Sequence, residues 1–567
     1  MADATETKPS LWSSLAAMGR DKSLAAMLLL GLGAGLPYAV LTGTLNAWFT
    51  EENVDVSTIG VLSWIGLAYA FKFLWSPALH RSRLPFFSKL GARRGWMLGF
   101  QLVIMLAMGT LTLANPGSQL GLITLMALLG VVASASQDIV IDAWRIEAAR
   151  DEDHLNSLSA LYQLGYRVAG FLGGFLALIL AARIGWSFTF ALLTLMMVLA
   201  VAGVLIAPES RRSDTDEPEE GVTLGAGLPT RTRRAALGVV VLGWGWALWM
   251  LGDFMAATIL SDTPPNARNF IRGYGPWIVF VTVILPAIIS AALLWLEGRS
   301  TAPKVVDRSG LGRAADTLHR FILEPLMDII SRLKWAAPLV LLLILSYRFT
   351  DLVWGAFAYP FYLGTNYGAM GYTMDDVALA SKFVGVIMTI AGVGLGGLAL
   401  KAFGRMSCLI VGAILAAATN LLFWDLTTGA SYVGGFLSFT RLDDFMALFQ
   451  INERLGWLVA AIAGENLAVG FASVVFVAYL SAIVNPRYAA VQYALMASLT
   501  MLIGTLGRGA LGELIEERGF AYVFILTALL GLVAVAASIA EALRTRFATK
   551  PATSDAAAGA SESDANP

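Results

Sequence analysis

Two carboxylates, Asp138 and Asp142, lie four residues apart in an apolar stretch that is long enough to cross a bilayer. On a helix this spacing places both side chains on one face. An ionisable side chain at the centre of a membrane span costs about 3 kcal/mol even on lenient insertion scales, and such groups commonly serve proton relays or substrate pathways. The pair is therefore a candidate site for handling protons or substrate. We prefer the deeper Asp138 as the proton carrier and keep Asp142 as a second candidate.

Two cations lie in neighbouring apolar stretches. Arg167 is near the middle of its stretch and needs an anion, for which Asp138 and Asp142 are the predicted partners; it is either a structural counter-charge or a trigger for proton release. Lys72 lies nearer to a stretch end, where a lysine can also extend its amine to the membrane surface. Both are candidate charge partners of the carboxylates.

The composition identifies a polytopic membrane protein, since 57% of the residues are hydrophobic, 14% are charged and the mean hydropathy is +0.69. A net charge of -1 gives no basic field for nucleic acid. The single cysteine, Cys408, excludes an intramolecular disulfide, and three scattered histidines (His80, His154 and His319) form no metal cluster. We expect no cofactor and no metal. Without a phosphate-binding loop or a hydrolase constellation, neither ATP nor enzyme activity is expected.

Apolar runs of about 20 residues predict fourteen membrane spans. The predicted spans are 24–47, 58–79, 95–113, 119–142, 157–182, 187–207, 236–260, 276–296, 335–360, 376–399, 406–424, 456–484, 490–512 and 519–541. Span 236–260 is also compatible with an interfacial helix, because it contains three closely spaced tryptophans.

The distribution of lysine and arginine predicts that both termini are cytoplasmic. With that orientation 28 of the 39 basic residues are cytoplasmic, 6 are on the opposite side and 5 are within spans. The densest short basic loop, after the second span, includes Arg81, Arg93 and Arg94. It either fixes the orientation or acts as a conformational gate.

An internal repeat predicts two related bundles. Gly170-Phe-Leu-Gly173 followed by Gly185-Trp-Ser-Phe-Thr-Phe190 returns 334 residues later as Gly504-Thr-Leu-Gly507 followed by Gly519-Phe-Ala-Tyr-Val-Phe524. Parallel six-helix halves with a site between them are typical of the major facilitator architecture. We therefore predict an all-α polytopic membrane protein with a major facilitator fold. Its predicted parts are a cytoplasmic N-terminus (1–23), a six-helix bundle (24–207), a linker with two extra spans and an amphipathic cytoplasmic helix (208–334), a second six-helix bundle (335–541) and a disordered cytoplasmic tail (542–567).

The second bundle has charged candidates of its own. Arg348 and Asp351, three residues apart, either neutralise each other or line the central cavity. Lys382 either holds an anionic group of the substrate or forms a salt bridge across the halves. Glu465, followed by Asn466, is a second proton site or a structural hydrogen-bonding pair, on a helix equivalent to the one that carries Asp138. The predicted extramembrane loop 425–455 is long enough to be a folded lid.

Several sequence strings resemble those of AmpG-type muropeptide permeases. They are Gly43-Thr-Leu-Asn-Ala-Trp48, Phe71-Lys-Phe-Leu-Trp-Ser-Pro77, Arg93-Arg-Gly-Trp96, Ser134-Ala-Ser-Gln-Asp-Ile-Val-Ile-Asp-Ala-Trp144, Leu164-Gly-Tyr-Arg167, Glu465-Asn-Leu467 and Gln492-Tyr-Ala-Leu495. The resemblance covers most of both halves. The chain differs from this family at His80, which precedes Arg81 where an aspartate is usual. It also differs in the position of the two extra spans, which lie between the halves.

The resemblance implies proton-driven import of anhydromuropeptides across the bacterial inner membrane for peptidoglycan recycling, by a monomer in the lipid bilayer. A glycopeptide site would use aromatic platforms and amides. The substrate-binding candidates are Gln137, Tyr166 and Tyr347, because they adjoin the charged residues, and then Trp144, Gln163 and Asn466. The alternatives are a transporter of acetyl-coenzyme A, a peptide or a drug, and a membrane sensor or scaffold that no longer transports.

Overall fold

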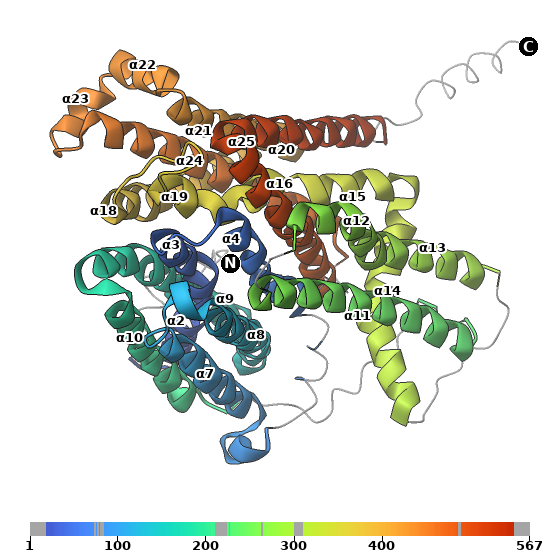
Figure 1. Ribbon diagram of the computed structural model, residues 1–567. Coiled ribbons are helices and arrows are strands. Elements are labelled where there is room, and N and C mark those ends of the chain that lie inside the picture. Colours follow the sequence, from blue (N-terminus) through green and yellow to red (C-terminus); the bar gives the residue numbers. More distant parts are fainter. Residues whose placement is uncertain are drawn as a thin grey trace, which may run out of the picture.

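The computed structural model describes residues 19–72, 75, 79, 84–209, 224–225, 227–261, 265–299, 310–485 and 489–548. Within these residues the secondary structure is helical and contains no strand. Figure 1 shows two groups of helices with a third, smaller group beside them. We call α2 to α10 the N-terminal half, α11 to α13 the inserted helices and α15 to α25 the C-terminal half.

The N-terminal half begins where the Asp21 side chain accepts a hydrogen bond from the Ser23 backbone and so caps the first helix. Its first span passes through a π-helical segment, a geometry that is frequent at functional sites. The helical segments of this half are α2 (Lys22–Ala39), η1 (Val40–Thr44), α3 (Leu45–Glu51), α4 (Val56–Leu62), η2 (Ser63–Gly66), α5 (Leu67–Phe71), η4 (Pro85–Leu90), α7 (Ala92–Thr110), α8 (Pro116–Ala148), α9 (Glu152–Phe171), η5 (Leu172–Leu176) and α10 (Ala177–Ile206).

The inserted helices pack against the long helix that leads into the C-terminal half. They are α11 (Thr230–Leu260), α12 (Ala267–Val279), η6 (Phe280–Ile284) and α13 (Leu285–Glu297). The following helix, α14 (Gly310–Leu333), contains the amphipathic segment 321–332. Its apolar residues Ile322, Leu323 and Met327 are buried against α11 and α13. On its other side, Asp328 accepts a hydrogen bond from Gln492 of the C-terminal half.

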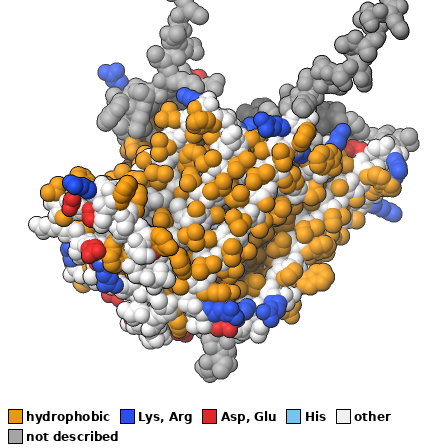
Figure 2. All heavy atoms as spheres, turned by 90° about the horizontal axis from the view of Figure 1, so that it is seen from above, with side chains coloured by type: hydrophobic (Ala, Val, Ile, Leu, Met, Phe, Trp, Pro, Cys, Tyr) orange, Lys and Arg blue, Asp and Glu red, His pale blue; other side chains and the backbone are white. Residues whose placement is uncertain are grey.

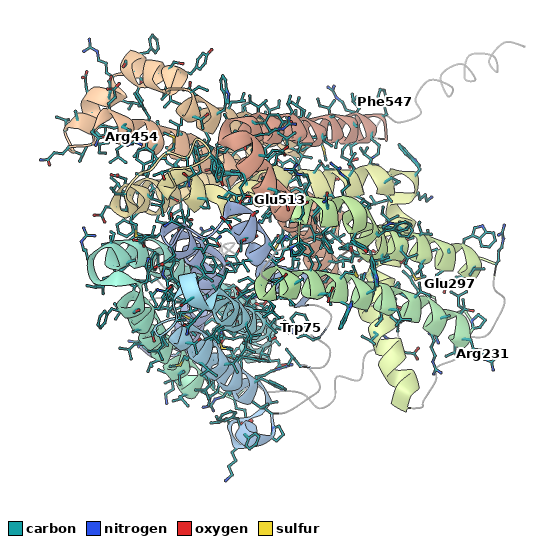
Figure 3. All side chains as sticks on the ribbon, in the orientation of Figure 1. Trp75, Arg231, Glu297, Arg454, Glu513 and Phe547 are labelled. Carbon is teal, nitrogen blue, oxygen red and sulfur yellow. The ribbon has the colours of Figure 1, made fainter. Side chains whose placement is uncertain are left out.

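The C-terminal half consists of η7 (Lys334–Ala336), α15 (Ala337–Ser346), α16 (Phe349–Trp354), η8 (Gly355–Phe357), α17 (Ala358–Leu363), α18 (Met374–Val377), η9 (Ala378–Val384), α19 (Gly385–Phe403), α20 (Arg405–Ala418), α21 (Asn420–Thr427), α22 (Ser431–Thr440), α23 (Leu442–Ala447), α24 (Glu453–Ile483) and α25 (Ala489–Ala548). Most of the predicted loop 425–455 is helical, since α22 and α23 lie within it. In Figure 3, Arg454 and Phe547 mark opposite ends of this half.

The repeat seen in the sequence is present in the backbone. The chain turns within α10 at Gly185, with φ 78° and ψ 166°, and within α25 at Gly519, with φ 78° and ψ 169°. This conformation is essentially restricted to glycine. The same turn therefore separates two successive helices at the same point of each half.

Eleven helical stretches of the described residues are long and apolar enough to cross a membrane. Two of them contain the glycine turns, and the apolar helix at residues 56–71 is shorter, so the number of fourteen crossings stays a prediction. Figure 2 shows a broad surface of apolar side chains with charged residues gathered near its rims. That pattern fits a surface covered by lipid tails, with charges at the interfaces.

The two halves are joined at the end of the bundle that holds the Gly519 turn. There Glu516 of α25 accepts a hydrogen bond from the Ser57 backbone at 2.7 Å, and Arg183 of α10 forms a bidentate pair with Asp375 of α18 at 2.7 and 3.2 Å. A further hydrogen bond between the halves, at 3.5 Å from Asn46 of α3 to the Ala356 carbonyl, lies in the turns that lead to this same end. We call it the joined end.

Candidate functional site

The site is built around Asp138 on α8 and Lys72, the residue that follows α5. The Asp138 side chain is 12% exposed, and its Oδ2 lies 3.7 Å from Lys72 Nζ. Its second oxygen, Oδ1, is buried and has no hydrogen-bond partner in the described part of the chain. The carboxylate therefore has one loose ionic contact and one unsatisfied acceptor.

A group of tyrosines surrounds this pair. The Tyr38 and Tyr69 rings meet edge to face at 5.1 Å, and Tyr166 lies 6.2 Å from both Tyr38 and Tyr162. Tyr69 donates a hydrogen bond to Ser134, one turn before Asp138. These contacts bring α2, α5, α8 and α9 together around the carboxylate, and Trp75, labelled in Figure 3, donates a hydrogen bond to Ser136 of α8 at 2.9 Å.

Asp142 has a different partner. Its carboxylate pairs with Arg145 on the same helix at 3.0 Å, and its side chain is 45% exposed. The Arg145 guanidinium also lies over the Tyr162 ring, 5.4 Å from the centroid. Both carboxylates that were predicted to neutralise Arg167 are thus paired with other cations in the structure.

Arg167 instead lies on an exposed face of α9, together with Gln163 one turn earlier. Phe171 continues this face one turn later, and its ring stacks on Phe175 at 4.8 Å. Phe175 in turn lies 6.0 Å from Phe383 of the C-terminal half. Because residues four apart share a helix face, Gln163, Arg167 and Phe171 form one exposed strip of α9, which leads toward the contact with the C-terminal half at Phe175.

Two amides and an indole that were candidates for substrate binding serve helix packing. Gln137 is fully buried and donates a hydrogen bond to the Gly33 carbonyl on α2 at 3.1 Å. Trp144 is also fully buried and donates to the Pro208 carbonyl at 3.0 Å. Asn466 accepts a hydrogen bond from Thr389 of α19 at 3.1 Å, so its amide joins two helices of one half.

Tyr347 lies within the C-terminal half. It is 1% exposed, stacks on Phe476 at 4.7 Å and donates a hydrogen bond to the Leu409 carbonyl at 3.2 Å. Tyr166, in contrast, is half-buried within the tyrosine group of the N-terminal half. Of the three preferred substrate-binding candidates, Tyr166 alone is within the group around Asp138.

Arg348 and Asp351 of the C-terminal half pair with each other. Arg348 contacts Asp351 at 2.8 Å and donates a second hydrogen bond to Ser473 of α24 at 2.8 Å. Glu465 is half-buried on α24.

Lys382 lies at the contact between the halves. Its ammonium is 5.2 Å from the centroid of the Tyr359 ring, which is a cation–π geometry. Its alkyl chain covers Gly174 of the N-terminal half, where an added Cβ would come within 3.1 Å of the lysine.

The sequence reasoning missed Arg508 of α25. Its Nε donates a hydrogen bond to the Leu352 carbonyl at 2.8 Å, and it interacts electrostatically with Tyr38 of the other half. The sequence was sufficient to identify Arg508 as a candidate, because it is one of only five basic residues within the predicted spans.

The basic loop is described in part, since Arg81 lies outside the described residues. Arg93 pairs with Glu147 at 2.5 Å, and Arg94 donates hydrogen bonds to the carbonyls of Val204 and Leu205. Both arginines therefore fasten helices of the N-terminal half to one another. In the described part of the chain, no group of three or more metal-ligating side chains is present.

Comparison with known proteins shows what the chain is similar to. Residues 27–313 match the sequence pattern of the Major Facilitator Superfamily. The anhydromuropeptide permease of Escherichia coli (strain K12) is 28% identical over 88% of this chain and 76% of its own length. A putative transporter AmpG 4 of Rickettsia felis is 23% identical over 91% of this chain and 95% of its own length.

Solved structures show the same fold at low sequence identity. The POT family transporter PepTSo superposes with a TM-score of 0.57 at 13% identity over 92% of this chain and 97% of its own. The nucleoside transporter NupG superposes with a TM-score of 0.52 at 12% identity over 92% of this chain and 98% of its own. The predicted all-α transporter fold is confirmed.

Proposed function

The chain belongs to the Major Facilitator Superfamily, and from this premise we propose that it imports anhydromuropeptides across the bacterial inner membrane, driven by protons. The cargo is inferred from the similarity to the Escherichia coli anhydromuropeptide permease and the Rickettsia AmpG-like transporters. The proton coupling is inferred from the geometry at Asp138. Transport proceeds by alternating access, in which one half rocks against the other around a site between them.

The observation that carries the coupling is the pair formed by Lys72 and Asp138, at 3.7 Å and from different helices. Protonation of Asp138 removes its negative charge and releases Lys72, whereas loss of the proton restores the pair. Because α5 and α8 are separate elements, the separation of the two groups changes when these helices shift. A proton on Asp138 therefore favours one arrangement of the helices over the other.

The cargo is held on the face of α9 that carries Gln163 and Arg167. A short peptide presents carboxylates, for which a guanidinium forms strong charge-assisted hydrogen bonds. The glutamine amide supplies a donor and an acceptor for sugar hydroxyls. Tyr166 and Tyr38 behind this face supply aromatic surface for the apolar side of a sugar ring.

The joined end is the extracytoplasmic end when the orientation follows the distribution of basic residues. The structure then corresponds to a state that is closed toward the outside. Separation of Arg183 from Asp375 and of Ser57 from Glu516 belongs to the step that admits cargo from outside.

The test is uptake of labelled anhydromuropeptide into proteoliposomes of defined orientation, with and without an inward proton gradient. We expect gradient-dependent accumulation by the wild-type protein and its loss in Asp138→Asn, with the folded state retained in detergent. Arg167→Gln is expected to weaken cargo binding, seen as a higher KM, while the dependence on the gradient remains. Accumulation by Asp138→Asn at the wild-type level would remove Asp138 from the mechanism, and no accumulation by folded wild-type protein would refute the cargo.

A further inference from the structure

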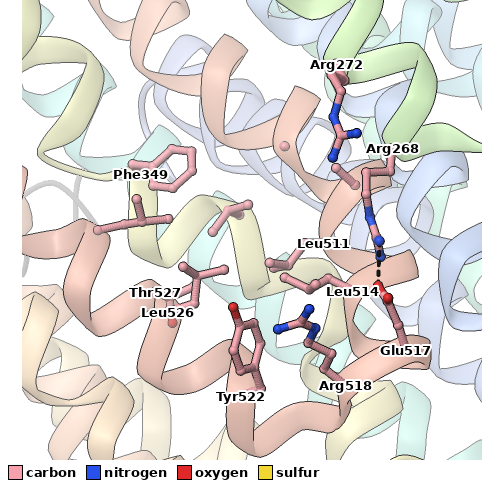
Figure 4. Close-up of a pocket in the computed structure, with 14 residues that line it drawn as sticks. Arg268, Arg272, Phe349, Leu511, Leu514, Glu517, Arg518, Tyr522, Leu526 and Thr527 are labelled. Carbon is pink, nitrogen blue, oxygen red and sulfur yellow. Dashed lines mark hydrogen bonds and ion pairs between the residues drawn. The ribbon is translucent and has the colours of Figure 1, made fainter.

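A cavity of about 370 Å³ lies outside the space between the halves, where inserted helix α12 meets α16 and α25 (Figure 4). The volume is in the range of small-molecule sites, roughly 300–1000 Å³. Figure 4 shows its lining side chains converging from α12 and α25, close to the Gly519 turn. The cavity is therefore at the joined end and is bounded on one side by the inserted helices.

One part of the cavity is strongly basic. Arg268, Arg272 and Arg518 line it together with a single carboxylate, Glu517. Arg268 is bound to that carboxylate at 2.5 Å, as the dashed line in Figure 4 marks. Arg272 and Arg518 are exposed, and neither forms an ion pair with a carboxylate of the described residues. The Arg518 guanidinium also lies over the Tyr522 ring, 5.0 Å from its centroid, a contact that leaves its N–H groups able to bind an anion. Two guanidinium groups thus remain available for an external anion.

The other part of the cavity is apolar. It is lined by Phe349 and Val353 of α16 and by Leu526 and Leu530 of α25. From Tyr522, beside the arginines, to Leu530 the helix rises by about 12 Å at 1.5 Å per residue. One leaflet of a bilayer has a hydrocarbon depth of about 15 Å, half of the full core. The cavity thus runs from interfacial charge to a depth that an acyl chain occupies.

We propose that this cavity binds an anionic phospholipid of the leaflet at the joined end. Its phosphate lies between Arg272 and Arg518, and one acyl chain lies along Leu526 and Leu530. Arginine suits this ligand because its planar guanidinium forms paired hydrogen bonds with phosphate oxygens. A soluble anion would satisfy the arginines and leave the apolar part unfilled.

A bound lipid would join the inserted helices to the C-terminal half. Without it, α12 is fastened to α25 there by the contacts of Arg268 with Glu517 and, at 3.9 Å, with Glu513. The lipid phosphate would add contacts from Arg272 of α12 and Arg518 of α25 to one ligand. The assignment does not depend on the cargo or on the proton coupling.

The test is native mass spectrometry of the purified full chain, titrated with phosphatidylglycerol or with phosphatidylethanolamine of the same acyl chains. We expect selective retention of phosphatidylglycerol. The double variant Arg272→Gln, Arg518→Gln should weaken this binding roughly 30-fold, since each basic residue near an anionic lipid contributes about fivefold. Arg441→Gln, which removes one exposed arginine from the 425–455 segment, is the control for loss of a positive charge away from the cavity and should bind as the wild type does.

A second variant separates a lipid from a soluble phosphate. Leu530→Trp changes a partly exposed residue at the apolar end, and it should reduce lipid retention while all charges remain. Equal binding of the two lipids would overturn the proposal, as would unchanged phosphatidylglycerol binding in the double arginine variant. Displacement of the lipid by millimolar inorganic phosphate, with no effect of Leu530→Trp, would identify an anion site in place of a lipid site.

Discussion

In the N-terminal half, Lys72 and Asp138 face each other from two helices at 3.7 Å, whereas in the C-terminal half Arg348 and Asp351 lie one turn apart at 2.8 Å. The C-terminal pair has a further hydrogen bond from Arg348 to Ser473. A pair within one turn keeps its geometry when helices move, but a pair between helices does not. Under the proposed proton coupling, this difference predicts that protonation is linked to conformation mainly in the N-terminal half.

The largest predicted effect comes from substitutions that break each of the two ion pairs, Lys72 with Asp138 and Arg348 with Asp351. Lys72→Met should lower the initial uptake rate at least about tenfold, equivalent to about 1.4 kcal/mol of barrier, and should change the dependence of uptake on pH. Arg348→Met should lower uptake less and leave the form of the pH dependence unchanged, because Asp351 is not the proton carrier. Uptake rates in oriented proteoliposomes across a range of pH measure both. Equal changes in the two pH profiles would contradict the distinction between the halves.

The position of the charged site was predictable from the sequence, but the ionic partners were not. Asp138 stands out because any charge inside an apolar run does. The choice between Arg167 and Lys72 depends on how the helices are rotated against each other, and spacing along the chain does not contain that information. In the structure Lys72 faces Asp138, and Arg167 lies on an exposed face of α9.

The aromatic and amide candidates show a second physical limit on predicting site residues from the sequence. Gln137 and Tyr347 were preferred because they adjoin charged residues in the sequence. Successive residues on a helix do not face the same direction, so a neighbour of a cavity residue points elsewhere. Gln137 accordingly donates to Gly33 on α2, and Tyr347 stacks on Phe476. Residues one helical turn away are better candidates, as Ser134 and its partner Tyr69 illustrate.

The repeat was the strongest predictor of the fold, because the equivalent glycines at 185 and 519 have nearly identical backbone angles. The lipid-sized cavity, in contrast, is assembled from α12, α16 and α25, which are far apart in the sequence. No periodic pattern within one segment could indicate it.

A second prediction compares these two glycine turns. Alanine at either position adopts a strained backbone that costs about 1–3 kcal/mol. An added Cβ at Gly519 would also come within 3.0 Å of the Tyr367 carbonyl, while nothing lies within 4 Å of one at Gly185. Gly519→Ala should therefore lower the melting temperature in detergent more than Gly185→Ala does. Equal decreases in melting temperature would mean that the backbone at Tyr367 shifts to accommodate the added Cβ with no loss of stability, and that the two turns are energetically equivalent.

The smallest predicted effect concerns how helices begin in the two halves. Asp21 caps α2 with a charged group that also contacts Arg150 at 2.9 Å and His154 at 3.3 Å. Burial raises the pKa of Asp21, but the hydrogen bonds from Ser23 and the electrostatic contacts with Arg150 and His154 outweigh it and hold the pKa below its ordinary value. In the C-terminal half the cap of α24 is Asn452, which carries no charge.

A carboxyl group whose pKa is lower in the folded protein stabilises it above the unfolded pKa, about 3.9 for aspartate, and this stabilisation is lost as the pH falls through the folded value. Asp21→Asn keeps a capping oxygen and loses the ionic contacts, so at neutral pH it should cost about 0.5 kcal/mol, as is usual for partly exposed pairs. Near pH 3 the variant and the wild type should approach each other in stability. Asn452→Ala should cost about 1 kcal/mol at every pH, because it removes a neutral cap. Thermal unfolding of the three proteins between pH 3 and 8 measures these differences, and a pH-independent deficit in Asp21→Asn would show that the aspartate acts only as a hydrogen-bond acceptor.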